Sequence, residues 1–226
     1  ENILNNQSPQ DQINIYFARS NILHKEKDYK ESAKYLQLAN QMKLHMKPSN
    51  PNILISKSKS LLIESDQKEV HKKEQKKYPE NIFIVGMPRS GSTLLESILS
   101  LNSNVDDLGE LNILEKSFLE SKKIDQKLTL SELYLNKANR QNIDFKITTD
   151  KWLYNYQYSG IIANQIPNAK IIHCYRNPLD NILSIYRAHF ARGNQYSSSL
   201  VHTAKVYLDQ DEIMTEYKNR FRSKIY

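Results

Sequence analysis

The segment from Gly86 to Thr93 limits most strongly what this chain can fold into. It reads Gly-Met-Pro-Arg-Ser-Gly-Ser-Thr and directly follows the continuous apolar run Ile82–Val85. A short apolar run between Pro79 and a glycine is typical of a strand buried in a parallel sheet. A helix is expected to follow, from about Thr93 to Leu101. The sequence therefore predicts a strand, a tight loop and a helix in immediate succession.

The Gly86–Thr93 loop has the composition of an anion-binding site. The chain has only five glycines, and two of them flank this turn. Glycine lets the backbone curl so that successive N–H groups face inward, and the N-terminus of the following helix adds positive charge. The spacing matches the nucleoside-triphosphate loop G-x-x-x-x-G-K-[ST], except that Ser92 stands where lysine is required. Arg89 supplies the cation instead, so we expect a phosphate-binding loop that does not serve an ATP or GTP hydrolase.

Strand and helix patterns alternate through the rest of the C-terminal part. Strands are expected at 145–148 and 169–174, and the last residues, 224–226, look like the opening of another strand. This alternation predicts an α/β fold, a parallel sheet with helices on both faces. We interpret His173 and Cys174 as core residues. Helices are expected at 110–122, 129–141, 156–165, from Pro178 onward and at 199–221.

The N-terminal part, from about residue 12 to 66, is predicted to be helical throughout. It contains no glycine, and residues 14–45 suit two antiparallel helices with a turn at Lys27–Tyr29. A third helix is expected at 52–64. This arrangement resembles a tetratricopeptide repeat. The small residues Ser20, Ser32 and Ala39 alternate with the bulky Tyr16, Leu23 and Leu36, as close helix packing requires.

We therefore predict a tetratricopeptide-like helical segment at 1–66, a charged linker at 67–80 and an α/β domain at 81–226. The linker is lysine-rich, and we interpret it as a solvated helix rather than a nucleic-acid patch. The sequence begins without an initiator methionine or a signal-peptide pattern, so we expect a processed product or an internal piece. We also expect the α/β domain to be truncated at its C-terminal end.

The composition limits which ligands and binding partners are expected. The net charge is +7 and its excess is spread over the chain. A dispersed excess fits an anionic ligand or an acidic acceptor, or simply a solubilising surface, and it does not indicate a nucleic-acid partner. No run of about 18 apolar residues occurs, which argues against a membrane span. The single cysteine favours a reducing, cytoplasmic compartment, and none of the six histidines has metal-ligand spacing, so we expect no metal.

The hexapeptide Pro88–Thr93 resembles the 5′-phosphosulfate-binding loop of sulfotransferases. The rest of the chain is most similar to the tetratricopeptide-containing bacterial-type group, which is related to tyrosylprotein sulfotransferases. The resemblance implies a P-loop-like sulfotransferase fold and 3′-phosphoadenosine-5′-phosphosulfate (PAPS) as co-substrate. Arg176 and Ser184 would bind its 3′-phosphate, although Arg176 could instead pair with Asp180. The other residues implied in co-substrate binding are Arg89, Ser90, Gly91, Ser92, Thr93 and, on the adenine side, Tyr207.

The resemblance also assigns the chemistry. Glu110 aligns with the family's general base, and Lys151 aligns with the lysine near the bridging oxygen, where Arg89 would help to stabilise developing charge. Glu110 could instead be a first-turn glutamate that favours the helix dipole, and Lys151 a solvated strand-end lysine. Residues 111–117 contain no arginine, unlike relatives that sulfate acidic tyrosine peptides, and Ala188 stands where relatives often have a basic residue.

These assignments imply an enzyme, a PAPS-dependent sulfotransferase that transfers a sulfuryl group to an acceptor hydroxyl, with a peptide or protein, and protein tyrosine in particular, as candidate acceptors. Glu110 would act as the base in an in-line displacement. Two other interpretations stay open: an adaptor that binds a protein partner through its tetratricopeptide helices and carries a non-catalytic nucleotide-binding domain, and a nucleotide kinase.

Overall fold

The computed structural model describes residues 7–66, 80–138 and 147–226. Its contacts group the chain into two units, one formed by Glu1–Leu54 with Asn177–Tyr207 and the other by Ile55–Arg176 with Leu208–Tyr226. Each unit has a hydrophobic core of its own. These units are defined by contacts and differ from the three segments expected from the sequence at 1–66, 67–80 and 81–226. Those domain boundaries stay a prediction. The proposed linker helix (67–80) lies outside the described residues except for Glu80.

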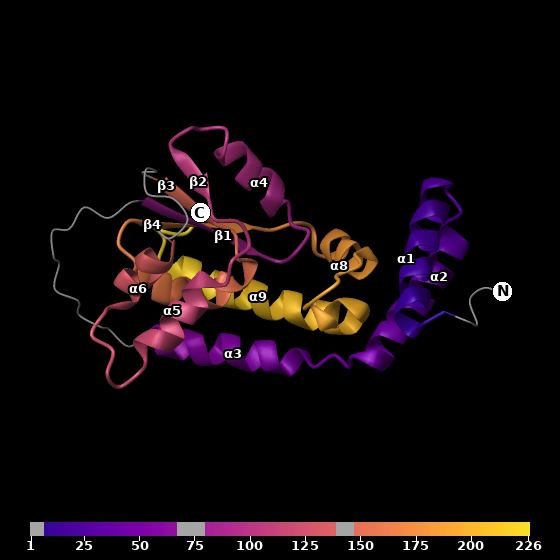
Figure 1. Ribbon diagram of the computed structural model, residues 1–226, viewed down its shortest axis with the longest axis horizontal. Coiled ribbons are helices and arrows are strands. Elements are labelled where there is room, and N and C mark those ends of the chain that lie inside the picture. Colours follow the sequence, from indigo (N-terminus) through magenta and orange to yellow (C-terminus); the bar gives the residue numbers. More distant parts are fainter. Residues whose placement is uncertain (1–6, 67–79, 139–146) are drawn as a thin grey trace. The chain divides into compact units, whose positions relative to one another are not determined.

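The first unit is built on a pair of helices, α1 (Pro9–Lys25) and α2 (Tyr29–Met46). Each begins at a capping side chain: Ser8 accepts from the Asp11 N–H and Asp28 from the Glu31 N–H. The helical hairpin expected at 14–45 is therefore present, and Figure 1 shows its two helices side by side. The unit also contains α8 (Pro178–Arg187), the 3₁₀ helix η2 (Gln195–Ser198) and the first residues of α9 (Leu200–Arg220).

The small residues of the hairpin lie where the two helices touch. The Ser20 hydroxyl donates to the Ser32 carbonyl (2.9 Å), and the Ser32 hydroxyl donates to the Ser20 carbonyl (2.8 Å). This reciprocal pair needs backbones closer than bulky side chains would allow. Ala39 is fully buried beside Ile13 and Phe17. The close packing expected from the small residues is thus observed, while the kinship to tetratricopeptide repeats stays a prediction.

The second unit contains a four-stranded, entirely parallel sheet with the order β2-β3-β1-β4. The predicted α/β fold with a parallel sheet is confirmed. Ile225 forms a further parallel bridge to Ile171 of β4, as expected for the last three residues. Strand β2 was missed by sequence analysis. The strands are β1 (Glu80–Gly86), β2 (Val105–Asp107), β3 (Ile147–Asp150) and β4 (Ala169–Cys174).

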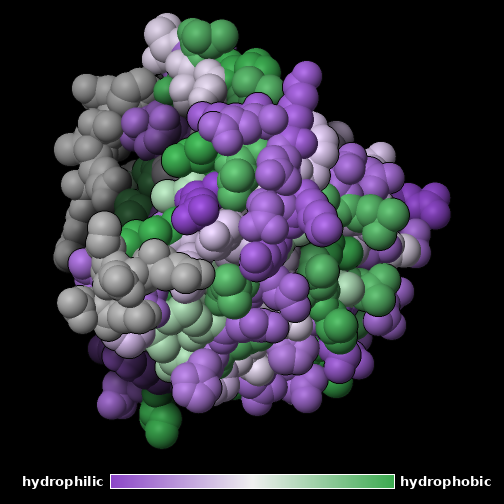
Figure 2. Space-filling model, turned by 90° about the vertical axis from the view of Figure 1, so that its right-hand side faces the viewer, coloured by the Kyte–Doolittle hydropathy of each residue, from purple (hydrophilic) through white to green (hydrophobic). Residues whose placement is uncertain are grey.

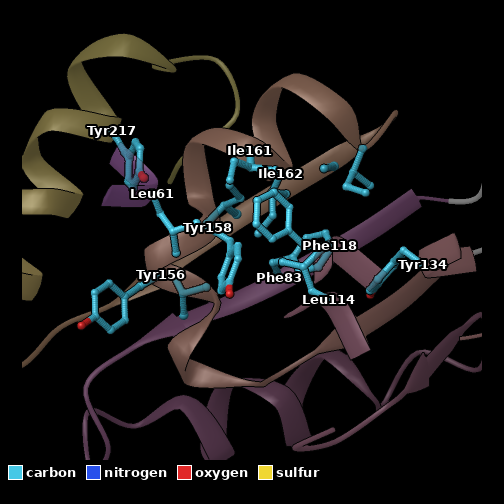
Figure 3. Close-up of a cluster of buried hydrophobic side chains, with 14 of the residues drawn as sticks. Leu61, Phe83, Leu114, Phe118, Tyr134, Tyr156, Tyr158, Ile161, Ile162 and Tyr217 are labelled. Atoms are coloured by element: carbon cyan, nitrogen blue, oxygen red, sulfur yellow. The ribbon is translucent and has the colours of Figure 1, made fainter. Parts of the chain in front are cut away.

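The core of this unit packs on β1, whose residues Phe83, Ile84 and Val85 are fully buried. Figure 3 shows Phe83 beside Phe118 and Tyr134, and the Phe83 and Tyr134 ring centroids are 5.4 Å apart. The helices predicted at 110–122 and 129–141 are both present, the first as Ile113–Ser121 and the second from Leu130, with 139–141 outside the described residues. The helices contributing to the core are α3 (Pro51–Glu64), α5 (Ile113–Ser121), α6 (Leu130–Ala138), the 3₁₀ helix η1 (Leu153–Tyr158), α7 (Ser159–Gln165) and α9.

His173 on β4 is buried, as predicted for a core residue. Burial, helped by the charge of Lys218, lowers the pKa of His173 to about 4, and the side-chain amide of Gln210 lies in hydrogen-bond contact with Nε2 at 2.6 Å. The ring is therefore neutral at physiological pH. Cys174, at the end of the same strand, is a half-buried free thiol.

Hydrophilic residues make up most of the face drawn in Figure 2, and hydrophobic residues form small separate groups on it. None of the helices in the described ranges combines the length and apolar character that a bilayer crossing needs.

The end of β1 depends on Gly86. Its φ is +143°, and a Cβ at this position would lie 2.2 Å from the Cys174 carbonyl oxygen on β4. Gly91 also has a positive φ, +101°, but a Cβ there would meet no atom within 4 Å. An alanine at Gly91 therefore introduces backbone strain alone, whereas an alanine at Gly86 introduces strain and a steric clash.

We expect Gly91→Ala to lower the free energy of unfolding by about 1–2 kcal/mol, the cost of a left-handed alanine. Gly86→Ala should lower it by about 1–3 kcal/mol more, because β4 must also move. Urea denaturation of both variants measures the difference. Equal losses would mean that the β1–β4 contact does not require glycine.

Candidate active site

The Gly86–Thr93 loop joins β1 to α4 (Ser92–Leu99). Arg89 has a φ of +67°, so three residues of this short turn, Gly86, Arg89 and Gly91, have left-handed backbone. Alternation of this kind turns consecutive N–H groups inward. No side chain caps the N-terminus of α4, where Gly91 is the cap residue. The loop and the first turn of α4 therefore offer backbone donors to an anion.

Ser90 supports the same interpretation. Its Oγ is buried and has no hydrogen-bond partner among the described residues. A buried hydroxyl without a partner is unfavourable unless a ligand or a water completes it. Arg89, the cation of the loop, is exposed. A donor-rich backbone, an unsatisfied buried hydroxyl and a neighbouring guanidinium fit the oxygens of a phosphate or sulfate group.

Parallel pairing of β2 with β3 brings two distant segments to the same edge of the sheet. Val105 pairs with Ile147, and the pairing continues past β2, because the Leu108 N–H donates to the Thr149 carbonyl at 2.8 Å. One step further the Lys151 N–H donates to the Gly109 carbonyl at 3.0 Å. These bonds place Glu110, the residue after Gly109, directly beside Lys151.

The Lys151 ammonium is the centre of the site. Its Nζ lies 2.8 Å from Glu110 Oε1, 3.3 Å from Glu96 Oε2 and 3.4 Å from Thr93 Oγ1. Lys151 is buried, so the alternative of a solvated strand-end lysine is wrong. The two carboxylates differ in their surroundings, because the Glu110 side chain is 61% exposed and that of Glu96 only 10%.

Burial and ion pairing have opposite effects on the pKa values of Lys151 and Glu96. Burial alone would lower the pKa of Lys151, but the hydrogen bond that Lys151 donates to Glu110 and the charges of Glu96 and Glu110 outweigh it, and the pKa lies above its ordinary value. Burial raises the pKa of Glu96, and the neighbouring Lys151 offsets only part of that rise. Lys151 is therefore fully protonated at neutral pH.

Asp150, the residue before Lys151, fixes the chain around it. It is fully buried and accepts hydrogen bonds from the Tyr134 hydroxyl (3.1 Å), the Trp152 N–H (3.0 Å) and the Asn155 amide (3.1 Å). Burial raises the pKa of Asp150 to about 7, and the Trp152 and Tyr134 hydrogen bonds limit that rise. The side chain anchors the turn between β3 and η1 and so the position of Lys151.

The structure brings together part of the residue set expected from the sequence. Thr93, Glu110 and Lys151 meet at one point, and Ser90 to Ser92 belong to the adjoining loop. Ser184, half-buried in α8, and Tyr207, buried in α9, belong to the first unit, whereas Arg176 is an exposed residue of the second. The structure describes the two units separately, so a site formed by these three residues stays a prediction.

Sequence analysis missed Glu96 and Asp150. A glutamate three residues after Thr93, and an aspartate directly before Lys151, were the available indications. No group of three or more His, Cys, Asp or Glu side chains with the geometry of a metal site occurs among the residues that the structure describes. The expectation that the protein uses no metal stays a prediction.

The fold and the site define an α/β protein whose parallel sheet carries a glycine-bounded loop and a lysine–glutamate cluster at its carboxyl edge. The chain belongs to the sulfotransferase family: the model of this family matches residues 79–225, more than half of its length. The predicted sulfotransferase family is thereby confirmed. The closer tie to tetratricopeptide-containing and tyrosylprotein sulfotransferases stays a prediction.

A protein of Aquifex aeolicus (strain VF5) that is described only as uncharacterized is 32% identical to this chain over 168 residues. The matched part is 64% of this chain and 22% of that protein. The chain thus spans about a fifth of the length of this relative.

The raised pKa of Asp150 predicts a pH dependence of stability. Between the unfolded pKa near 4 and the folded pKa of about 7, the folded state keeps a proton that the unfolded state has lost. This contribution to stability is therefore complete at low pH and disappears as pH rises through about 7.

We expect Asp150→Asn, which keeps an acceptor for the Trp152 N–H, to become more stable relative to the parent as pH rises from 4 to 8. Thermal melts across this range measure the difference. Asp125→Asn changes an exposed aspartate and should show no such trend. A parallel shift of Asp150→Asn at every pH would contradict the assignment.

Proposed function

We propose that this chain transfers a sulfuryl group from PAPS to an acceptor hydroxyl. The observation that carries the proposal is the position of the Lys151 ammonium, within reach of both Thr93 in the Gly86–Thr93 loop and Glu110. A cation, an anion-binding loop and a carboxylate are the three parts that displacement at sulfur by a hydroxyl needs. Membership of the sulfotransferase family supports the same reaction.

The residues that would hold the co-substrate follow from the chemistry of its two ends. The backbone donors of the loop, the Ser90 hydroxyl and the Arg89 guanidinium suit a 5′-phosphosulfate, and Ser92 and Thr93 at the start of α4 add their hydroxyls. Arg176 and Ser184 would bind the 3′-phosphate, and Tyr207 would contact the adenine. PAPS, when bound, supplies a sulfuryl group on a good leaving group, the 5′-phosphate.

Three side chains would act on the reacting atoms. The Glu110 carboxylate takes the proton of the acceptor hydroxyl while its oxygen attacks sulfur. The S–O bond to the 5′-phosphate breaks, and the Lys151 ammonium and the Arg89 guanidinium stabilise the charge on the oxygens around that bond. Because the Glu110 side chain is 61% exposed, it can turn from Lys151 toward an acceptor that arrives from solvent.

The acceptor is expected to carry a hydroxyl group, with small molecules, peptides and protein tyrosine as candidates. The helical hairpin of α1 and α2 is a candidate surface for a protein partner. Both points rest on the proposed family group, and direct analysis of sulfonated products by mass spectrometry is the measurement that would identify the acceptor.

If the co-substrate is PAPS, the protein should bind adenine nucleotides that carry a 3′-phosphate more tightly than those that lack it. Adenosine 3′,5′-bisphosphate should stabilise the protein by about 2.7 kcal/mol at 100 times its Kd, because it binds only the folded state. Adenosine 5′-phosphate, which lacks only the 3′-phosphate, should bind more weakly, and Arg176→Ala should remove most of that difference. Titration calorimetry with both nucleotides measures it, with Arg222→Ala, an exposed arginine, as control. Equal affinities for the parent would refute the 3′-phosphate site.

If Glu110 is the general base, a conservative substitution at this position should lower turnover strongly. Glu110→Gln keeps the shape of the side chain but removes the base, so turnover should fall by ~10²–10⁴. Binding of adenosine 3′,5′-bisphosphate should change little. Glu120→Gln is the matched control, because Glu120 pairs with Lys137 away from the loop. Transfer from ³⁵S-labelled PAPS measures turnover. A Glu110→Gln variant with full turnover would exclude the role, and the adaptor alternative predicts no turnover even in the parent.

A further inference from the structure

Helix α4 buries a carboxylate while two of its large apolar side chains are exposed to solvent. Its buried residues are Ser92 and Glu96, whereas Leu94 and Ile98 are 67% and 55% exposed. Amphipathic helices normally show the opposite arrangement. A buried carboxylate is unfavourable unless a charge partner compensates it, and here that partner is Lys151.

The Lys151 ammonium can donate three hydrogen bonds. Glu110, Glu96 and Thr93 provide three acceptors, and they differ in how firmly they are held. In the proposed reaction Glu110 must leave Lys151 to meet the acceptor. Glu96, whose side chain is 10% exposed and anchored on α4, stays where it is. Its second oxygen, Oε1, is buried and has no hydrogen-bond partner among the described residues, so Lys151 is its principal polar contact.

We propose that Glu96 is a positioning residue, which holds the Lys151 ammonium beside the Gly86–Thr93 loop while Glu110 turns away to accept a proton. The inference rests on the proposed function, because it assigns Glu96 a task within that reaction. Glu110 makes the shorter contact with Lys151 (2.8 Å against 3.3 Å), but Glu96 is buried and held on α4, so its contact is the one that remains when Glu110 turns away. Without it, the flexible lysine side chain would follow the Glu110 carboxylate away from the loop.

The other charged groups around this pair oppose the ionised form of Glu96. Burial raises the pKa of Glu96, and the other two carboxylates that face it, Asp107 on β2 and Glu110, raise it further. Asp150 on β3 is the next carboxyl group, and the charge of Glu96 adds to the rise in its pKa. Lys151 is therefore the cation that favours the ionised form of Glu96, and Glu96 in turn favours the protonated form of Lys151 in its buried position.

The first test measures Lys151 directly and does not depend on catalysis. NMR of protein labelled with [ε-¹³C]lysine follows each ammonium group through a pH titration, and Lys151→Met identifies the signal. Glu96→Gln should lower the pKa of Lys151 by about 1 unit or more. Glu110→Gln should lower it as well, because Glu110 accepts the shorter hydrogen bond from Lys151. Glu115→Gln is the matched control, since Glu115 is a partly buried glutamate on α5 that pairs with Lys57. It should leave Lys151 unchanged.

The second test uses turnover. Glu96→Gln should reduce kcat about 10- to 100-fold, the usual effect of a misplaced catalytic group, and change the KM for PAPS little. The alkaline limb of its pH–rate profile should move to lower pH by the same shift that NMR gives for Lys151. In a Lys151→Met background Glu96→Gln should have no further effect on kcat, because Glu96 acts through that lysine. Glu115→Gln should retain parental turnover and profile.

The outcomes separate this inference from the proposed function. A parent protein that neither binds adenosine 3′,5′-bisphosphate nor transfers sulfate overturns the proposed function, and that result needs no variant. An active parent whose Lys151 pKa and alkaline limb are unchanged by Glu96→Gln overturns the positioning role alone. A folded Glu96→Gln variant with lower stability but parental kcat and pH profile does the same, because it assigns Glu96 a structural role only.

Discussion

The hydrogen bonds that β3 makes on both of its edges are the constraint on which the rest of the site depends. On one side β3 pairs with β1, which ends in the Gly86–Thr93 loop, and on the other with β2, which leads to Glu110. Because all three strands are parallel, their carboxyl ends lie at one edge of the sheet. The loop, the carboxylate and the lysine come from segments far apart in sequence, and parallel pairing alone brings them to one point.

Features built from contiguous residues could be predicted from the sequence, whereas features that depend on contacts between distant segments could not. The Gly86–Thr93 loop was predictable because its glycines, its preceding apolar strand and its helix are contiguous. Strand β2 was not, since it has three residues, two of them aspartates, and is stabilised by β3 rather than by its own composition. Glu96 was missed because leucines and isoleucines suggest the buried side of a helix, and in α4 two of them are exposed.

The proposed 3′-phosphate site shows what cannot be predicted from local sequence. Arg176 follows β4 and Ser184 lies in α8, so their order along the chain could be predicted from adjacent elements. Their distance depends on how the unit that contains α8 meets the unit that contains β4, and local sequence patterns carry no information on that. The helical hairpin was easier, because the contact of Ser20 with Ser32 involves two neighbouring helices joined by a short turn.

Electrostatics explains why the cluster needs carboxylates of three different kinds. An anionic co-substrate favours few negative charges near the loop, yet Lys151 needs a partner to stay buried and the proposed reaction needs a base. Asp150 has a pKa of about 7, so it is largely neutral below that pH while still anchoring the chain. Glu96 is paired with the Lys151 ammonium, which offsets a charge on its carboxylate, and the Glu110 side chain is 61% exposed, so that solvent screens its interaction with an anion in the loop. Differences in burial thus let three acidic side chains surround an anion-binding loop without opposing the anion.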